Sequence, residues 1–295
     1  MPFKFKREEI RRRNHRRPWH PRNAAVMLAL LSAGLGQAFA EQAHHQAGAA
    51  TVRAGQWIAQ PWETGEERLR WRIFGSYLSS QSRFDALGDR VALENNGRYS
   101  NFGLNAFLEY ALNPRWSIAG LAPLQWSRLS DDLSRERWVN VGDTYGWVRR
   151  SIEGNARWSA GALAGIKIPG NYRPGAATGD RQTDMEAQGF LGHGLGRGSF
   201  ASLGSGYRVR FGSPSDEIFF NAQFGWNPGN GWLLVPAAAG ALGVGGGVPK
   251  DFLNAGVTIF RSLRGPWRLL GSYNRVIAGK NTVSAGVWAL GVSYQ

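Results

Sequence analysis

Ten charged residues lie where apolar and polar side chains alternate, a pattern typical of a β-strand with two unlike faces. Arg68, Arg70 and Arg72 share one face of an expected strand, because successive side chains point in opposite directions. A basic constriction built from such charges attracts anions such as aromatic carboxylates, whereas opposite charges form ion pairs that fill a narrow interior. Charges of opposite sign on neighbouring strands favour ion pairs. The two arrangements can coexist in a water-filled interior enclosed by the strands, which we call the lumen. The candidates for lining the lumen are Arg68, Arg70, Arg72, Glu109, Lys167, Asp184, Glu186, Arg208, Arg210 and Glu217.

Four aromatic residues could stack against a hydrophobic solute: Trp71, Tyr77, Tyr145 and Trp147. Aromatic residues of membrane barrels more often face lipid or form girdles at its two interfaces. We therefore expect these four side chains on the lipid side rather than in a binding site.

Catalytic chemistry has little support in the sequence. Nucleophilic catalysis at an outer-membrane rim needs a His beside a Ser or Asp, and after residue 40 the chain has only His44, His45 and His193. An isolated His pair in a polar tail is seldom a metal site. The glycine-rich run 192–198 lacks the features of a phosphate loop or a dinucleotide fingerprint and favours a turn. Because the chain also has no Cys, we expect no enzyme, no catalytic residue, no metal and no cofactor.

The first forty residues have the order of a secretory signal peptide. A basic segment, 4–22, precedes a run of apolar and small residues, 24–36, and Ala38-Phe39-Ala40 fits a cleavage site. The apolar run is too short to span a bilayer as a helix. We predict cleavage after Ala40, a polar segment over 41–67 and one barrel domain over 68–295.

The net charge of +14 is not evidence for nucleic-acid binding. Residues 1–40 hold nine Lys or Arg and two Glu, a net of +7, which leaves +7 for the rest of the chain. The later basic residues are dispersed among expected strands and turns instead of forming one run. We therefore expect no nucleic-acid partner.

The elements that must position the charges are strands. Leu203, Tyr207 and Val209 alternate with Arg208 and Arg210, so one face is apolar and the other carries charge. Lipid outside and water inside require two such faces, and a lipid-facing Arg or Lys near the midplane costs about 2–4 kcal/mol. We predict an all-β fold, a transmembrane antiparallel up-and-down barrel of about twelve strands. The expected strands are 68–80, 98–112, 116–128, 142–152, 157–169, 183–193, 199–211, 216–226, 232–240, 251–261, 267–277 and 282–294.

The connections between these strands alternate in length. Turn-like links at 113–115, 153–156, 194–198, 227–231 and 262–266 separate connections that are mostly longer. Short periplasmic turns and long external loops have this asymmetry. Each of four tryptophans comes just after a short link, which predicts an aromatic girdle at the periplasmic interface; they are Trp116, Trp158, Trp232 and Trp267.

Three short motifs resemble the meta-pathway phenol-degradation outer-membrane family. They are Val141-Gly142-Asp143 before a strand, Ala164–Gly170 before a long connection, and Gly198–Arg210 with its Ser-Gly-Tyr-Arg sequence. The resemblance covers roughly residues 70–295 and implies a small outer-membrane channel, in some members associated with uptake of aromatic or hydrophobic compounds. No catalytic residue comes with this family.

The sequence therefore predicts a passive channel for small hydrophobic or aromatic compounds in the outer membrane of a Gram-negative bacterium. Its expected partners are the membrane lipid and the solute, and no feature indicates an oligomeric state. Two alternatives are a structural or interaction barrel with a plugged lumen and, with less support, an outer-membrane enzyme. The strands of a soluble β-sandwich would also alternate between apolar and polar side chains, but that fold gives no reason for a signal peptide.

Overall fold

The computed structural model describes residues 69–152, 157–171, 182–212 and 214–294. The predicted signal peptide, the polar segment 41–67, and Arg68, His44 and His45 therefore lie outside the described residues. Among the described residues, no helix is long and apolar enough to cross a membrane.

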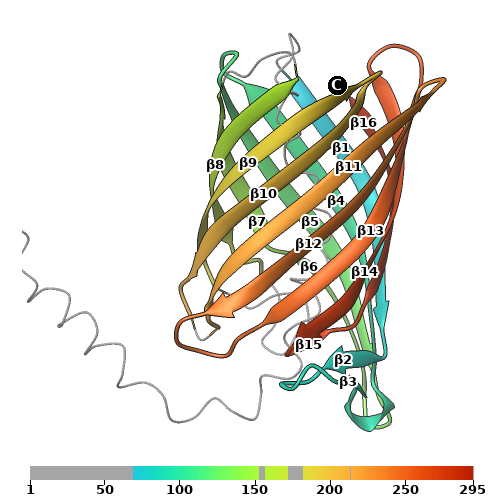
Figure 1. Ribbon diagram of the computed structural model, residues 1–295. Coiled ribbons are helices and arrows are strands. Elements are labelled where there is room, and N and C mark those ends of the chain that lie inside the picture. The colour runs from blue at the N-terminus through green and yellow to red at the C-terminus, as the bar shows by residue number, and fades with distance from the viewer. Residues whose placement is uncertain (1–68, 153–156, 172–181, 213, 295) are drawn as a thin grey trace, which may run out of the picture. The chain divides into compact units, whose positions relative to one another are not determined.

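Twelve strands of the described chain close into an antiparallel ring, as predicted (Figure 1). Neighbouring strands in the ring follow one another along the chain. The ring closes where the first strand pairs with the last, with Trp71 opposite Tyr294 and Ser79 opposite Gly286. The strands are β1 (Leu69–Ser80), β4 (Arg98–Ala111), β5 (Trp116–Ser130), β7 (Thr144–Ile152), β8 (Trp158–Ile168), β9 (Asp184–Gly196), β10 (Ser199–Arg210), β11 (Asp216–Gly229), β12 (Trp232–Val244), β13 (Asp251–Ser262), β14 (Trp267–Lys280) and β16 (Gly286–Tyr294).

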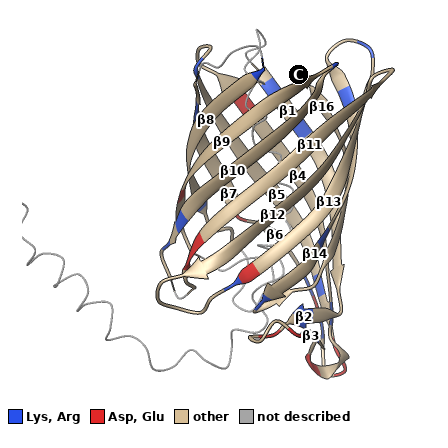
Figure 2. Ribbon diagram, in the orientation of Figure 1, with Lys and Arg blue, Asp and Glu red and all other residues tan. Residues whose placement is uncertain are grey.

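Side chains alternate between the two sides of the ring as the strand pattern predicts. In β10, Leu203, Tyr207 and Val209 are exposed, whereas Arg208 and Arg210 are buried. Every strand of the ring exposes large apolar side chains on its outer side, and Leu290 near the C-terminus is 73% exposed. Lys, Arg, Asp and Glu gather toward the two ends of the ring (Figure 2). This distribution is the one that a lipid-facing wall requires.

The two ends of the ring differ in the length of their connections. At the short-turn end, β9 and β10 are joined by Arg197 and Gly198, and β11 and β12 by Asn230 and Gly231. All four residues have positive φ, which is the conformation of a type I′ hairpin turn. Four exposed tryptophans surround this end, as the girdle prediction requires: Trp116, Trp158, Trp232 and Trp267.

The long-loop end holds additional strands that the sequence analysis assigned to connections. The segment 81–97 contains β2 (Ser82–Phe84), β3 (Arg90–Ala92) and a 3-10 turn (Glu94–Asn96). β2 and β3 form a small sheet with β15 (Thr282–Val283), at the lower end in Figure 1. The prediction of one strand over 282–294 was therefore wrong at its start, because these residues are divided between β15 and β16.

The segment 129–141 also forms a strand, β6 (Arg135–Val141), instead of a loop. It pairs with the long-loop half of β5, and β7 pairs with the other half. Between them the chain gains one residue relative to β5, which makes a bulge at Gly142 and Asp143 opposite Pro123. Proline lacks an N–H group, so a bulge is a favourable arrangement at this point.

Candidate functional site

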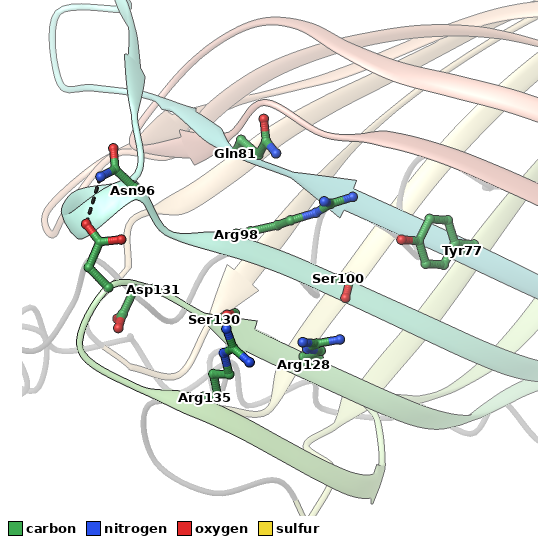
Figure 3. A pocket seen from close by; sticks show the side chains of 10 residues that line it. Tyr77, Gln81, Asn96, Arg98, Ser100, Arg128, Ser130, Asp131 and Arg135 are labelled. Atoms are coloured by element: carbon green, nitrogen blue, oxygen red, sulfur yellow. Dashed lines mark hydrogen bonds between the residues drawn. The ribbon is translucent and has the colours of Figure 1, made fainter.

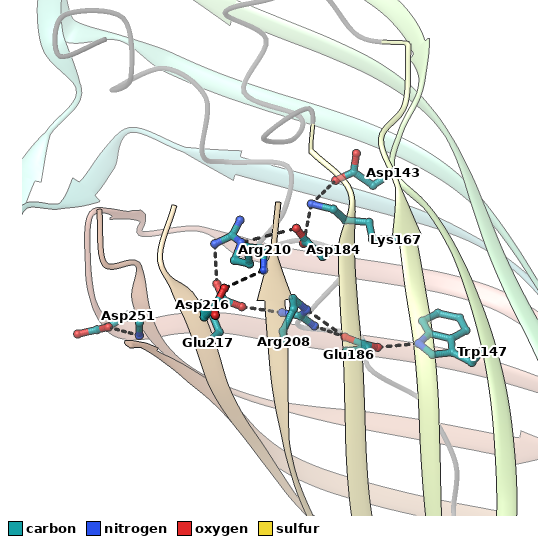
Figure 4. A network of polar contacts seen from close by, with 11 residues as sticks. Asp143, Trp147, Lys167, Asp184, Glu186, Arg208, Arg210, Asp216, Glu217 and Asp251 are labelled. Carbon is teal, nitrogen blue, oxygen red and sulfur yellow. Dashed lines mark hydrogen bonds and ion pairs between the residues drawn. The ribbon is translucent and has the colours of Figure 1, made fainter. Parts of the chain in front are cut away.

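Seven charged side chains form one cluster inside the long-loop end of the ring, which we call the rim cluster (Figure 4). Six of them are candidates from the sequence, and Asp143 is an addition. They lie where β8, β9, β10 and β11 meet the long-loop end, because Lys167 and Arg210 are near the ends of their strands and Asp184 and Glu217 near the starts. The members are Asp143, Lys167, Asp184, Glu186, Arg208, Arg210 and Glu217.

Arg208 is the most connected residue of the rim cluster. Its guanidinium lies 2.5 Å from Glu186 Oε2 on one neighbouring strand and 2.6 Å from Glu217 Oε2 on the other. Both contacts join residues directly opposite in the sheet register. Arg208 is 2% exposed and Glu217 is fully buried. Such charges are retained in an interior only where partners replace the lost water.

Arg210 and Lys167 extend these contacts to two further carboxylates, Asp184 and Asp143. Arg210 Nη1 donates to Glu217 Oε1 at 2.8 Å, and its Nε lies 3.8 Å from Asp184 Oδ1. Lys167 Nζ lies 2.8 Å from Asp184 and 3.7 Å from Asp143. Among the described residues, the cluster therefore contains three cations and four carboxylates. This pairing favours the ion-pair interpretation over a purely basic constriction.

A second group of charges lies at the short-turn end, and we call it the turn-end cluster. It consists of Arg70, Glu109 and Arg149. Glu109 lies 3.8 Å from Arg70 Nη1 and 3.5 Å from Arg149 Nη1, and it accepts a hydrogen bond from Ser117 Oγ at 2.8 Å. Arg72 is buried, and its guanidinium lies 5.6 Å from the ring centroid of Phe107. The structure thus places eight of the predicted charges in two groups at opposite ends of the interior.

Aromatic side chains occupy the wall between the two clusters. Tyr145 and Trp147 stack with ring centroids 5.4 Å apart, and they are 6% and 5% exposed. The prediction that these two face lipid was wrong, whereas Trp71 and Tyr77 do lie on the outer side with Ile73. Trp147 Nε1 donates to Glu186 Oε1 at 2.7 Å, so the aromatic wall is joined directly to the rim cluster.

Interior glycines make room for these aromatic side chains. Gly165 is directly opposite Trp147, and a Cβ there would lie 2.2 Å from Trp147 Cδ1. Gly161 is directly opposite Phe190, and a Cβ added at Gly161 would lie 2.3 Å from Phe190 Cζ. An aromatic ring that covers a cross-strand glycine is a known means of filling a β-sheet surface. The glycine content of the strands is therefore part of how the interior is packed.

Cations lie over several interior rings. The guanidinium of Arg149 is 5.2 Å from the ring centroid of Phe190, and that of Arg208 is 4.9 Å from Phe219. Both distances lie within the range of cation–π attraction. The interior can therefore offer a solute aromatic faces, cationic edges and carboxylates within one passage.

Strand parity held enough information to find the residues that the sequence analysis missed. Val148 and Ile152 are aliphatic and exposed at 45% and 53%, so they mark the outer side of β7. The opposite parity contains Tyr145, Trp147 and Arg149. The aromatic residues of β7 thus face the interior, although aromatic residues of membrane barrels more often face lipid.

The residues that the structure describes contain no group of three His, Cys, Asp or Glu able to hold a metal ion. His193 lies instead against Trp158, with ring centroids 4.2 Å apart near the short-turn end.

No family model and no curated protein sequence matches the chain. Its fold is similar to that of an outer-membrane channel from Pseudomonas putida F1, with a TM-score of 0.66 and 15% identity over 80% of this chain and 99% of that one. The translocator domain of the autotransporter NalP from Neisseria meningitidis has a TM-score of 0.52 and 12% identity, with 79% and 90% covered. The KdgM porin in complex with disordered oligogalacturonate has a TM-score of 0.51 and 7% identity, with 76% and 98% covered. At these identities the likeness concerns the fold, and the chain has the fold of outer-membrane β-barrel channels.

Proposed function

We propose that this chain is a passive channel for small aromatic or hydrophobic compounds in the outer membrane of a Gram-negative bacterium. The observation that carries the proposal is the interior wall between the two charged clusters, where Tyr145, Trp147 and Phe190 lie among Arg149 and Glu186. Side chains in a purely structural interior need only fill space, whereas this wall presents aromatic faces beside groups that can bind a polar edge.

Two further observations support a channel. The outer wall is apolar, which suits a barrel that spans the membrane. The Pseudomonas putida protein with the same fold is itself described as an outer-membrane channel, and the short motifs of the sequence resemble a family of small channels. In this proposal, the rim cluster is the polar constriction that a solute meets at the external mouth.

The rim cluster also favours a second candidate function. A cluster whose arginines and carboxylates are almost fully buried is suited to closing a passage. A barrel with a closed interior would act through its loops, as a structural or interaction protein. Transport measurements separate these two functions directly.

The test uses the full chain reconstituted in lipid vesicles and in planar bilayers. We expect small, stable conductance steps. We also expect the ratio of benzoate uptake to acetate uptake to be higher in vesicles that contain the protein than in protein-free vesicles. Trp147→Ala should lower the benzoate-to-acetate ratio roughly two- to tenfold, the value of an aromatic contact of about 0.5–1.5 kcal/mol. Trp226→Ala is the matched control, because Trp226 is 52% exposed on the outer wall. A folded barrel that neither conducts nor admits either solute would support the closed-interior function instead.

A further inference from the structure

Four arginines share the outer side of the wall at the long-loop end, outside both interior clusters. Arg98 is on β4, Arg128 on β5, and Arg135 and Arg137 on β6, and all four are exposed. We call them the outer arginine patch. The inward neighbours Tyr99 and Ser127 are buried at 2% and 3%, which places the arginines on the opposite, outer parity. Figure 3 shows three of them around one hollow.

The register of the strands concentrates this positive charge. Arg128 is directly opposite Arg137, and Arg98 and Arg135 are both opposite Ser130. Like charges opposite each other destabilise a sheet, so an anion between them would relieve a cost that the fold otherwise carries. A hollow of about 520 Å³ lies beside the patch, and its lining also contains Tyr77, Ser100 and two carboxylates, Asp131 and Asp132.

Two carboxylates in the lining of this hollow, Asp131 and Asp132, lower the net positive charge of the patch without cancelling its four arginines. Asp131 accepts hydrogen bonds from the backbone N–H groups of Leu133 and Ser134, and Asp132 accepts one from Asn96. Glu136 has the opposite parity on β6, because it is paired with Leu129. Within the part of the chain that the structure describes, none of the four arginines forms an ion pair.

The height of the patch on the wall indicates the kind of anion. Phe102 and Trp126 are opposite each other with ring centroids 5.5 Å apart, and they are 46% and 39% exposed. They lie two residues from Ser100 and Arg128, a distance of about 7 Å along a strand. Exposed aromatic residues mark the edge of the apolar band, so the arginines lie at the level of the lipid headgroups.

We propose that the outer arginine patch binds the phosphate groups of a phosphorylated lipid in the outer leaflet. Guanidinium forks match phosphate oxygens in geometry and charge, and the patch faces along the lipid-exposed wall rather than into the mouth. A lipid is the favoured source of phosphate because the apolar surface beneath the patch, with Val139 62% exposed, can hold its acyl chains. This inference rests on the proposed placement in an outer membrane and is independent of any solute transport.

The test measures lipid binding by the folded, detergent-solubilised full chain with native mass spectrometry. The probes are lipid A with its phosphates, lipid A with the phosphates removed, and inorganic phosphate as a competitor. We expect the phosphorylated form to bind and the dephosphorylated form to bind roughly tenfold more weakly, since removal of the phosphates removes the charge-assisted hydrogen bonds to the guanidinium groups. Arg128→Gln with Arg137→Gln should weaken binding of the phosphorylated form by a similar factor.

The matched control is Arg197→Gln with Arg264→Gln, which removes two exposed arginines at the short-turn end. It should leave lipid A binding unchanged. Equal binding by the wild type and the Arg128/Arg137 variant would overturn the proposal, as would equal binding of the two lipid forms. Displacement of lipid A by millimolar inorganic phosphate would indicate a site for free anions and would overturn the lipid assignment. Conductance of the same variants is recorded separately, so loss of the channel function and loss of lipid binding can be told apart.

Discussion

At the scale of single residues, Glu217 holds the rim cluster together. Its two carboxylate oxygens contact different arginines, Arg208 through Oε2 and Arg210 through Oε1. Because Glu217 is fully buried, no water takes the place of a partner that is lost. Removal of one member of a buried ion pair leaves an uncompensated charge, and this costs more than the pair itself contributes.

We expect Glu217→Gln to lower the free energy of unfolding by roughly 3 kcal/mol, measured by urea titration of the folded barrel in detergent. The variant should also shift selectivity toward anions in a salt gradient, since two arginines lose a counter-charge. Glu136→Gln is the control, because Glu136 is exposed on β6, and its effect should stay below about 0.5 kcal/mol. An unchanged unfolding midpoint for Glu217→Gln would show that the cluster does not depend on this carboxylate.

The sequence was sufficient to find most charged residues of the two clusters. Arg208 and Glu217 alternate with clearly apolar neighbours, so parity alone gave their side of the strand. Asp143 was not among the candidates; it lies in the bulge before β7, where the register with β5 changes. Partners were also beyond the sequence, since a contact such as that of Trp147 with Glu186 depends on the register of three strands.

At the scale of elements, the pairing of glycines with aromatic rings explains why bulky residues fit the inner wall. β8 contributes Gly161 and Gly165, and its two neighbours contribute Phe190 and Trp147. β10 and β11 repeat the arrangement with Gly206 opposite Phe219. Each ring covers the strand beside it because no Cβ stands in its way.

Gly165→Ala should therefore displace Trp147 and weaken its hydrogen bond to Glu186. The added Cβ would lie 2.2 Å from Trp147 Cδ1 and 3.1 Å from the carbonyl oxygen of Gly146. We expect a loss of about 1–3 kcal/mol in the free energy of unfolding, the range for overpacked interiors. Gly189→Ala is the control, because a Cβ at Gly189 meets nothing within 4 Å. If both variants unfold at the same urea concentration, the glycine has no packing role.

The strands of the ring were predictable because apolar outward-facing side chains alternate along them with inward-facing positions that include polar, charged and small residues. The additional strands were not. β2, β3 and β15 have two or three residues each, which is too short for alternation to be recognised. The outer side of β6 combines Arg135 and Arg137 with Val139, so it lacks the continuous apolar face by which the other strands were found. That departure is the same feature that makes the outer arginine patch a candidate lipid site.

At the scale of the whole molecule, closure of the ring depends on the pairing of the first and last strands. β1 pairs with β16 on one side and with β4 on the other, so it has no free edge. Closure matters in lipid because an unpaired strand edge would leave backbone groups without hydrogen bonds. The pairing of β1 with β16, which we call the seam, also joins residues that are far apart in sequence. Its formation is expected to be among the last steps of folding.

A pair of engineered cysteines can report on this seam, since the natural chain contains none. Ser76 is directly opposite Ala289, and opposed residues on paired strands are close enough for a disulfide. We expect Ser76→Cys with Ala289→Cys to cross-link on mild oxidation of the folded protein, which alters gel mobility after boiling without reductant. Ser76→Cys with Ser202→Cys should stay reduced, because Ser202 is on β10, which is not a neighbour of β1 in the ring.

Equal cross-linking of the two pairs, or none in the first pair when the barrel is folded, would contradict closure between β1 and β16. With the seam confirmed, the cross-linked form should resist heat unfolding more than its reduced form, because the bond constrains a loop that includes nearly the whole barrel.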